Sequence, residues 1–388
     1  MSQDIQDFVP TSCELLALGE PTHLEPAFGR IRNELFGRLA DRGFRSIALE
    51  TDRVAALRVD DYVQGGPGTL DEVMDEGFSH DFGELLANRQ LIAWMREFNE
   101  NRPAAERLVF HGFDGSMETT HAPSPRRYLE YARDYLGLDL DLGSLAGDDE
   151  RWSRTEAIMD AASSIGATAE AERLRVIADD LLTSLHIRAP ELIEATSRAE
   201  WYRARTHLTA GLGLLRYHQQ SAQRIDETAR VTGLCATRDA LMAQNLLDIR
   251  TVEARRGPTL VSAHNLHLQR NRSHMRMGPM GIDWWSAGAI AGAFLGERYT
   301  VVLGTLGSSE VIGLGEPEAE TYEAILQRRT TGWGLTAAHT VSPSASVVTR
   351  ADTTPQQGYF PLDRAVLDGA DALLHVSDGA AAVRAFRP

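Results

Sequence analysis

Glu20 and His23, three residues apart near the start of the chain, are the first pair whose side chains could do chemistry together. A carboxylate beside an imidazole orients the ring through one nitrogen and leaves the other to take a proton from water, which is general-base catalysis of hydrolysis. Gly19 precedes the pair and permits a tight backbone turn, which favours a functional site. The alternative is that both side chains cap the helix that follows.

A second group of polar residues, His264, Asn265 and His267, directly follows the apolar run TLVSA. Two histidines at this spacing in a loop can bind a transition metal, and Glu20 and His23 would complete a ligand set. The sequence has no HExxH helix, and neither of its two cysteines lies in a paired motif. We therefore predict a site without a metal or other cofactor, and keep a metal site as the alternative.

Other ionisable residues also stand where short apolar runs end. Glu50 ends RSIALE, and His111 and Asp114 end RLVFHGFD. The carboxyl ends of parallel strands meet at one edge of a sheet, where α/β proteins bind ligands. We therefore expect Glu20, His23, Glu50, His111, Asp114 and His264 to converge on one crevice. Taken alone, Asp114 is better explained as the cap of a turn.

Two arginines and one tryptophan are further candidates. Arg32 lies on the helix after His23, close enough to its start to reach back, and Arg53 follows the second strand. Either guanidinium could neutralise a carboxylate or hold an oxyanion through forked hydrogen bonds. Trp284 belongs to HMRMGPMGIDWW (274–285), which would form either a pocket wall for an apolar substrate or the start of a core helix.

The elements that must position these residues alternate between short apolar runs and segments of helical period, which indicates an α/β fold. The pattern predicts a central, mainly parallel sheet flanked by helices. The expected strands are 14–20, 45–50, 107–114, 259–265, 299–307 and 371–378, and the expected helices between them include 26–42, 53–63, 84–99, 285–296 and 318–328.

The segment 125–256 contains no strand signal and consists of amphipathic helical patterns rich in Ala, Leu, Arg and Glu. We predict that it is a helical insertion. It divides the α/β core into an N-terminal part, residues 1–124, and a C-terminal part, residues 257–388.

Composition excludes several classes of function. The 388 residues are 43% hydrophobic, which fits a globular protein, and the formal net charge of −16 disfavours nucleic acid as a partner. The chain has no lysine, which excludes Schiff-base and phosphate-loop chemistry that depends on lysine. The polar, acidic N-terminus is unlike a signal peptide, and no apolar stretch is long enough for a membrane span, so we expect a cytoplasmic protein.

Much of the chain resembles the erythromycin esterase family. The resemblance rests on LLALGEPTHLEPAFGRIRNELFGRLADRGFRSIALETD (15–52), AALRVDDYV (55–63), FHGFD (110–114), RDALMAQNLL (238–247) and VSAHNLHL (261–268). It implies an α/β fold with added helices, and hydrolysis of an ester or macrolactone by histidine-activated water without a bound metal.

Site residues can be carried over from the family at matching positions. The resemblance implies that His23 is the catalytic base, with Glu20 beside it, Arg32 on the next helix and Glu50 at the end of the second strand. His264 and His267 match the family's histidine pair, and Asp114 matches a recurrent aspartate. The sequence departs from the family at Pro21, Leu24 and Arg53.

Three hypotheses follow from these residues. In the first, His23 activates water, and Arg32 with His264 or His267 stabilises the oxyanion or protonates the leaving group. In the second, the same cleft catalyses elimination, cyclisation or acyl transfer on a secondary metabolite. In the third, the Glu/His group binds metal without turnover. No G-x-S-x-G motif occurs, so a serine nucleophile is not expected. The expected partner is a small molecule, macrolide-like or another secondary metabolite, and the oligomeric state stays open.

Overall fold

A seven-stranded sheet forms the centre of the computed structural model, which describes residues 2–118, 120–341 and 346–385. The strand order is β3-β2-β4-β1-β7-β9-β8, and all neighbours are parallel except β8, which pairs antiparallel with β9. The strands are β1 (Leu15–Glu20), β2 (Ser46–Asp52), β3 (Val109–Asp114), β4 (Thr259–His264), β7 (Tyr299–Ser308), β8 (Trp333–Ala337) and β9 (Ala372–Asp378). The predicted mainly parallel α/β fold is confirmed.

The strands are apolar along their length because both faces of the sheet are covered. Leu16 and Leu18 of β1 face one layer of helices, and Leu15 and Ala17 face the other. Parallel pairing places Glu20 at the end of β1 directly opposite His264 at the end of β4. The register of the core therefore brings two of the predicted site residues to the same edge.

One layer of helices packs on the face that carries Leu16 and Leu18. This layer contains α1 (Pro26–Ala40), α2 (Ala56–Val63), α3 (Leu70–Glu76), α4 (Leu86–Asn99) and α17 (Gly379–Ala385). The opposite face is covered by α12 (Glu227–Glu253), α14 (Ala287–Leu295), α15 (Tyr322–Gln327) and α16 (Arg364–Gly369). The short α13 (Asn265–Leu268) follows β4 directly.

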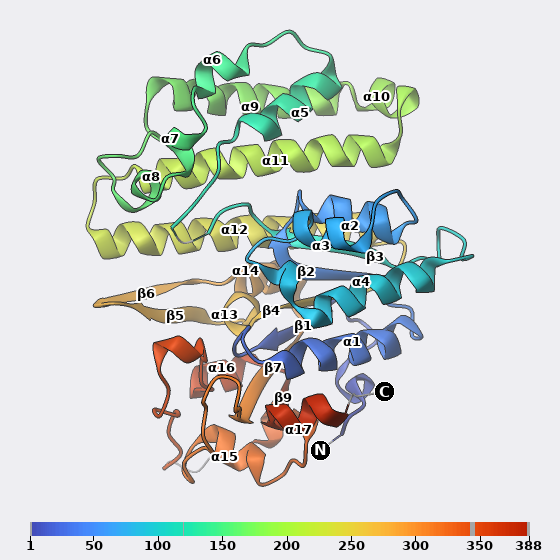
Figure 1. Ribbon diagram of the computed structural model, residues 1–388, viewed down its shortest axis with the longest axis vertical. Coiled ribbons are helices and arrows are strands. Elements are labelled where there is room, and N and C mark those ends of the chain that lie inside the picture. Colours follow the sequence, from blue (N-terminus) through green and yellow to red (C-terminus); the bar gives the residue numbers. More distant parts are fainter. Residues whose placement is uncertain (1, 119, 342–345, 386–388) are drawn as a thin grey trace.

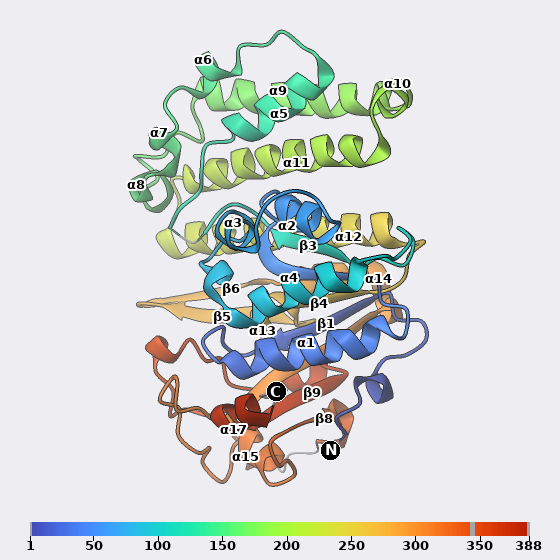
Figure 2. The same cartoon turned by 45° about the vertical axis from the view of Figure 1, so that its right-hand side comes forward.

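The described residues between β3 and β4 form helices and no strand, apart from one isolated bridge between Glu118 and His121. The helices are α5 (Arg126–Leu136), α6 (Leu142–Ala146), α7 (Glu150–Ser153), α8 (Thr155–Met159), α9 (Ala169–Ile187), α10 (Ala189–Ala195), α11 (Arg198–Ser221) and α12. The layer formed by α5 to α11 has its own buried core, which includes Trp152, Leu174 and Leu208. Figures 1 and 2 show α12 lying between this layer and the sheet.

The segment 274–285 is a β-hairpin, formed by β5 (Arg272–Met277) and β6 (Met280–Trp285). The prediction that Trp284 begins a core helix is therefore wrong, since α14 begins at Ala287. Gly278, at φ 57°, makes the turn. Ile282 and Trp284, two residues apart on β6, lie on the same face of the hairpin and pack against α12. Alternation of period two is a strand signal, and the methionines and glycines of this segment obscure it.

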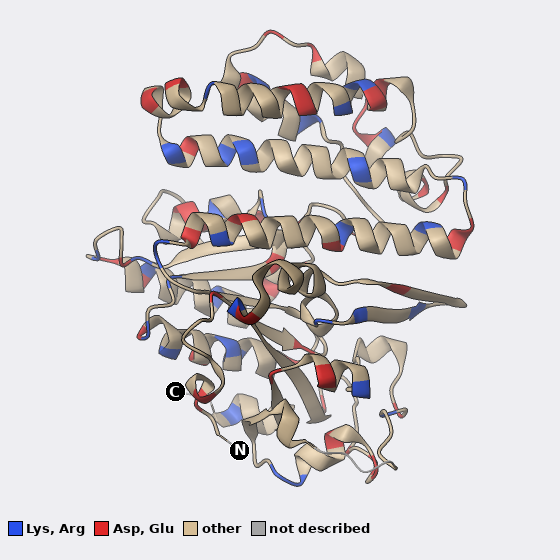
Figure 3. Ribbon diagram, turned by 180° about the vertical axis from the view of Figure 1, so that it is seen from behind, with Lys and Arg blue, Asp and Glu red and all other residues tan. Residues whose placement is uncertain are grey.

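Charged residues of both signs are interspersed over the helices, as the rear view in Figure 3 shows. Many are paired in exposed ion pairs, for example Arg38 with Glu34 and Arg364 with Asp368. Such pairs contribute little stability each, about 0–1 kcal/mol. No helix in the described part of the chain is long and apolar enough to cross a membrane.

Candidate active site

His23 lies between two carboxylates at the carboxyl edge of the sheet. Its Nδ1 is 2.7 Å from Glu20 Oε1, and its Nε2 is 3.6 Å from Glu50 Oε2. Glu20 ends β1, Glu50 lies near the end of β2, and His23 stands in the loop between β1 and α1. This loop ends where Glu25 caps α1 by accepting a hydrogen bond from the Ala27 N–H, followed by Pro26 in the first turn.

The two carboxylates favour the protonated ring. Burial alone would lower the pKa of His23, but the negative charges of Glu50 and Glu20 and the hydrogen bond to Glu20 raise it to about 10. His23 is therefore an imidazolium at neutral pH in the free protein. Its ring also packs against Phe82, with centroids 4.9 Å apart, and against His264, at 5.2 Å.

Glu50 is held in place by groups on three other elements. Its Oε2 accepts a hydrogen bond of 2.8 Å from the His264 backbone N–H, and its Oε1 lies 3.4 Å from both Arg238 Nη2 and His267 Nε2. Burial alone would raise the pKa of Glu50, but His267, His23 and Arg238 bring it well below its usual value. Glu50 is therefore ionised and fixed.

His264 has no free ring nitrogen for chemistry. Its Nε2 is 3.1 Å from the Pro21 carbonyl oxygen, and its Nδ1 accepts a hydrogen bond of 3.2 Å from the Leu266 N–H. Burial and the charge of His23 lower the pKa of His264 to about 3, so the ring is neutral. The side chain ties the β1–α1 loop to the end of β4, and its backbone holds Glu50.

His267 joins the site to α12. Its Nδ1 is 3.0 Å from Asp239 Oδ1, and Asp239 also accepts hydrogen bonds from Trp284 Nε1 and the Ala287 N–H. Burial would lower the pKa of His267, but Asp239 and Glu50 raise it. His267 therefore bridges two carboxylates in the same way as His23.

A second charged cluster lies beside Glu50. Asp114, fully buried at the end of β3, accepts hydrogen bonds from Arg238 Nε at 3.1 Å and from Arg238 Nη2, and lies 3.0 Å from His80 Nε2. Burial would raise the pKa of Asp114, but Arg238 and His80 lower it to about 2. His80 and Asp81 have left-handed backbone, at φ 58° and 57°, and such strain is typical of functional segments.

A cavity of about 590 Å³ opens over His23. Of the predicted site residues, Glu20, His23, Arg32 and Glu50 line it, and Phe82 and Asn88 line it too. The other five predicted residues lie outside its lining: His264, His267, Asp114, Arg53 and Trp284.

Arg32 contributes a guanidinium without a carboxylate partner. It is buried, and it donates to the amide oxygens of Asn33 at 2.9 Å and Asn88 at 2.9 Å. Burial lowers the pKa of Arg32 to about 10, against the opposing effect of Glu20. A cation held by neutral amides beside the candidate base is suited to stabilise negative charge on a bound molecule.

Arg53 and His111 point to other parts of the molecule. Arg53 pairs with Asp248 at 2.5 Å and donates to the Asn245 carbonyl, so it ties the loop after β2 to α12. His111 Nε2 is 3.0 Å from Glu253 Oε1, near the end of α12. The expected convergence therefore includes Glu20, His23, Glu50, Asp114 and His264, but not His111. A substrate-binding role for Arg53 or Trp284 has no support from this arrangement.

Gly19 is required by close packing against Asn265 and not by a backbone turn. It lies within β1, and a Cβ atom at this position would be 2.3 Å from Asn265 Oδ1. Asn265 Oδ1 accepts a hydrogen bond of 3.1 Å from the Gly304 N–H, and Asn265 Nδ2 donates one of 2.8 Å to the Gly304 carbonyl. The missing side chain lets Asn265, just after β4, reach across β1 to Gly304 of β7.

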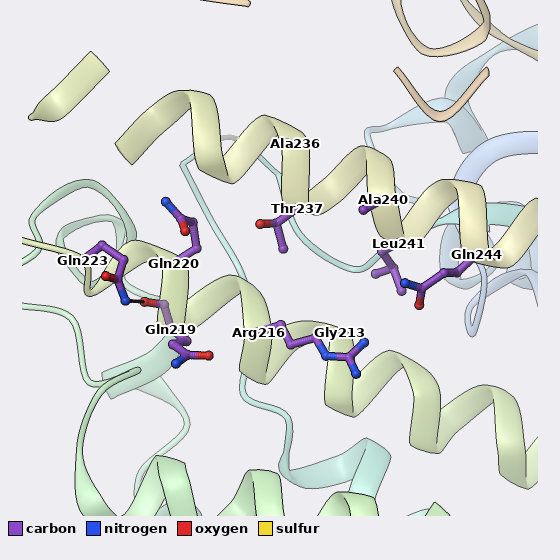
Figure 4. Close-up of a pocket in the computed structure, with 10 residues that line it drawn as sticks. All are labelled: Gly213, Arg216, Gln219, Gln220, Gln223, Ala236, Thr237, Ala240, Leu241 and Gln244. Atoms are coloured by element: carbon purple, nitrogen blue, oxygen red, sulfur yellow. Dashed lines mark hydrogen bonds between the residues drawn. The ribbon is translucent and has the colours of Figure 1, made fainter. Parts of the chain in front are cut away.

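Another cavity, of about 510 Å³, lies between α11 and α12 (Figure 4). Gln219, Gln220 and Gln244 line it with Arg216 and Thr237. Its lining contains no histidine or carboxylate, so it offers no group for general acid–base catalysis near neutral pH. The cavity over His23 is the candidate active site.

No three His, Cys, Asp or Glu side chains of the described residues are grouped so as to hold a metal ion. In the predicted ligand set, both nitrogens of His264 already have hydrogen-bond partners. Asp239 and Glu50 likewise occupy both nitrogens of His267.

Besides Phe82 and Asn88 of the lining, the residues that hold the charged groups of the site, Arg238, Asp239 and His80, were not singled out from the sequence. Arg238 and Asp239 are adjacent on α12, and one pairs with Asp114 while the other pairs with His267. The sequence feature that could have identified them is the adjacent pair of opposite charges in an otherwise apolar helical stretch. His80 lies between helices in a loop, and nothing in the sequence shows that this loop brings it to Asp114.

The family model described as erythromycin esterase matches residues 39–379, a range that begins after Glu20 and His23. No curated protein sequence matches the chain.

Three solved structures share the fold. A Bacillus cereus protein is 16% identical, with a TM-score of 0.68, over 96% of this chain and 90% of that one. A succinoglycan biosynthesis protein is 16% identical, with a TM-score of 0.66, over 96% and 89%. A mutant of the erythromycin esterase EreC in its open conformation is 18% identical, with a TM-score of 0.65, over 95% and 91%.

Proposed function

This chain belongs to the erythromycin esterase family, and we propose that it hydrolyses a carboxylic ester or lactone of a small molecule with water activated at His23. The observation that carries the proposal is the position of His23 between Glu20 and Glu50 at the cavity. Macrolide-like compounds and other secondary metabolites are the proposed substrates. The proposed reaction needs no metal.

In the proposed reaction, the neutral His23 ring keeps its Nδ1 proton in a hydrogen bond to Glu20, which leaves the unprotonated Nε2 to take a proton from water. The water oxygen bonds to the carbonyl carbon, and Arg32 stabilises the oxyanion that forms. Collapse breaks the bond to the leaving oxygen, which takes the proton from His23 Nε2. The products are a carboxylic acid and an alcohol, and His23 is restored.

His264 and His267 are positioning residues in this proposal. Both hold Glu50, which in turn faces His23 Nε2 at 3.6 Å. This distance is too long for a hydrogen bond, and it leaves Nε2 without a close acceptor. We therefore assign the general-base role to His23 and the oxyanion role to Arg32 alone.

The raised pKa has a consequence for the rate. With a pKa of about 10, only about one molecule in a thousand carries neutral His23 at pH 7. Since the base must be neutral to accept a proton, we expect kcat/KM to rise about tenfold per pH unit above neutrality and to level off near pH 10.

The test uses p-nitrophenyl esters and lactones of graded acyl length with purified protein. His23→Gln should lower kcat/KM about 10²- to 10⁴-fold, the usual loss of a general base. His274→Gln is the matched control, because His274 is an exposed histidine on β5. Wild-type activity in the His23 variant would exclude His23 as the base.

Acyl transfer, elimination and cyclisation in the same cleft are separated from hydrolysis by isotope labelling. In ¹⁸O-labelled water, hydrolysis places one labelled oxygen in the acid product. If the substrate is fully consumed and the product carries no label, the reaction is not hydrolysis but one of these three.

A further inference from the structure

The cavity over His23 has an exposed apolar rim. Eleven large apolar side chains are exposed in the described part of the chain, and four of them line this one cavity. They are Leu24, Leu85, Leu86 and Val311, with exposed fractions of 50, 39, 54 and 63%. They come from the β1–α1 loop, the start of α4 and the loop after β7. A cluster from separate segments around a concavity marks a binding surface for an apolar group.

Three arginines without a carboxylate partner line the same cavity. Arg32 is buried, is bonded only by amide oxygens, and has no partner for its Nη1 among the described residues. The side chains of Arg30 on α1 and Arg384 on α17 make no hydrogen bond or ion pair with any residue the structure describes. Helices α1 and α17 pack together, as Figures 1 and 2 show, and both residues line the cavity.

The acidic residues of the cavity form no ion pair with these arginines. Glu20 and Glu50 are engaged with His23, and Glu25 accepts hydrogen bonds from the Ala27 N–H at 3.0 Å and from Ser309 Oγ at 2.5 Å. Only Glu84, on the rim, has no side-chain partner among the described residues. With His23 protonated, the lining carries four positive groups and four carboxylates and is near neutral in a chain of net charge −16, and its cations Arg30 and Arg384, unpaired among the described residues, can pair with a negative ligand.

We infer that this cavity takes an amphiphilic anion, a molecule in which an apolar chain or ring lies next to a carboxylate, phosphate or sulfate group. The apolar part packs on Leu24, Leu85, Leu86 and Val311, and the anionic group faces Arg30 and Arg384. Such an anion would be the substrate of the proposed hydrolase, and only its role as substrate rests on that proposed function. Binding itself is independent of turnover.

The test measures binding by isothermal titration calorimetry with three probes of equal chain length: octanoate, octylammonium and 1-octanol. We expect wild-type protein to bind octanoate at least tenfold more tightly than octylammonium. Octyl phosphate and octyl sulfate, compared with octanoate, identify which anionic group is preferred. Leu85→Asn with Leu86→Asn should weaken all probes together, because it removes the apolar contact common to them.

The charge contribution is isolated by two double variants with the same change in net charge. Arg30→Gln with Arg384→Gln should weaken octanoate about three- to tenfold and leave 1-octanol within about twofold, as expected for two partly exposed charges. The control is Arg42→Gln with Arg255→Gln, two exposed arginines outside the cavity lining, and it should leave all affinities unchanged.

Three results would overturn the inference: octylammonium binding as tightly as octanoate, equal losses in both double variants, or no binding of any anionic probe at millimolar concentration. The same titrations with His23→Gln separate the two proposals. If His23→Gln retains full esterase activity while wild-type protein prefers octanoate, the catalytic proposal fails and the substrate class stands.

Discussion

Replacing Glu50 with glutamine removes one of the two negative charges that hold the proton on His23. The amide has nearly the shape of the carboxylate and still offers an oxygen to the His264 N–H, which Glu50 Oε2 accepts at 2.8 Å. Glu50→Gln therefore tests electrostatics with little change in geometry.

The size of the effect follows from the distance. At 3.6 Å and an effective dielectric constant of about 20, a unit charge on Glu50 stabilises the imidazolium by about 332/(20 × 3.6), or about 4.6 kcal/mol. At about 1.4 kcal/mol per pKa unit, this corresponds to about three units. The pKa of His23 should therefore fall from about 10 to about 7.

Two measurements report this shift. The imidazole ¹⁵N resonances of His23, assigned from their loss in His23→Gln, should titrate about three pH units lower in Glu50→Gln. The ascending limb of kcat/KM against pH should move by the same amount, because the neutral ring is the base. Glu253→Gln is the matched control, since Glu253 forms another buried pair, with His111 at 3.0 Å, away from the cavity.

A shift of less than one unit in the titration of His23 would show that Glu50 does not set the proton affinity of the ring. A full shift in the titration with an unmoved rate profile would instead mean that His23 is not the general base. An activity that falls with rising pH in the wild type would require imidazolium, and His23 would then act as an acid.

The remaining predictions concern packing, the charged cluster and metal. Gly19→Ala should destabilise the protein by about 1–3 kcal/mol in urea unfolding, because its methyl group would overlap Asn265; Gly37→Ala, with open space around it on α1, should be neutral or stabilising. Arg238→Met leaves Asp114 buried without its guanidinium partner and should cost about 3–5 kcal/mol, again by unfolding, and an unchanged midpoint would contradict the pairing. Dialysis against a chelator should leave esterase activity unchanged. If the activity is lost and one added divalent cation restores it, the reaction depends on a metal.

The sequence predicted the fold and the residues nearest the cavity because these are local features. Strands β1, β2 and β4 are continuous apolar runs, and their ends are marked by Glu20, Glu50 and His264. Parallel strands bring their carboxyl ends together, so the meeting of these residues follows from topology. The catalytic role of each residue stays a prediction, as do the boundaries of the helical insertion at 125 and 256.

What could not be predicted depends on packing between distant elements. No periodicity shows that Arg238 reaches Asp114 or that Asp239 holds His267, because these contacts depend on how α12 lies across the sheet. The same pairings leave Asp114 and His267 outside the cavity lining, although both follow strands. A residue at a strand end can face the ligand or support the residue that does, and the sequence alone does not separate the two.

The helix α12 connects the stability of the site to that of the helical layer. Its buried Met242 and Leu246 pack on the sheet, while Leu241 packs against α11, so the position of α12 depends on both. Arg238 neutralises Asp114 and approaches Glu50 from the same helix. If α12 moved away, Asp114 would lose its strongest cation and Glu50 would lose one of its three, and a buried carboxylate left without a partner costs several kcal/mol. The charged cluster therefore forms only when α12 is docked, and a change in the helical layer that displaces α12 must also change the proton affinity of His23 through Glu50.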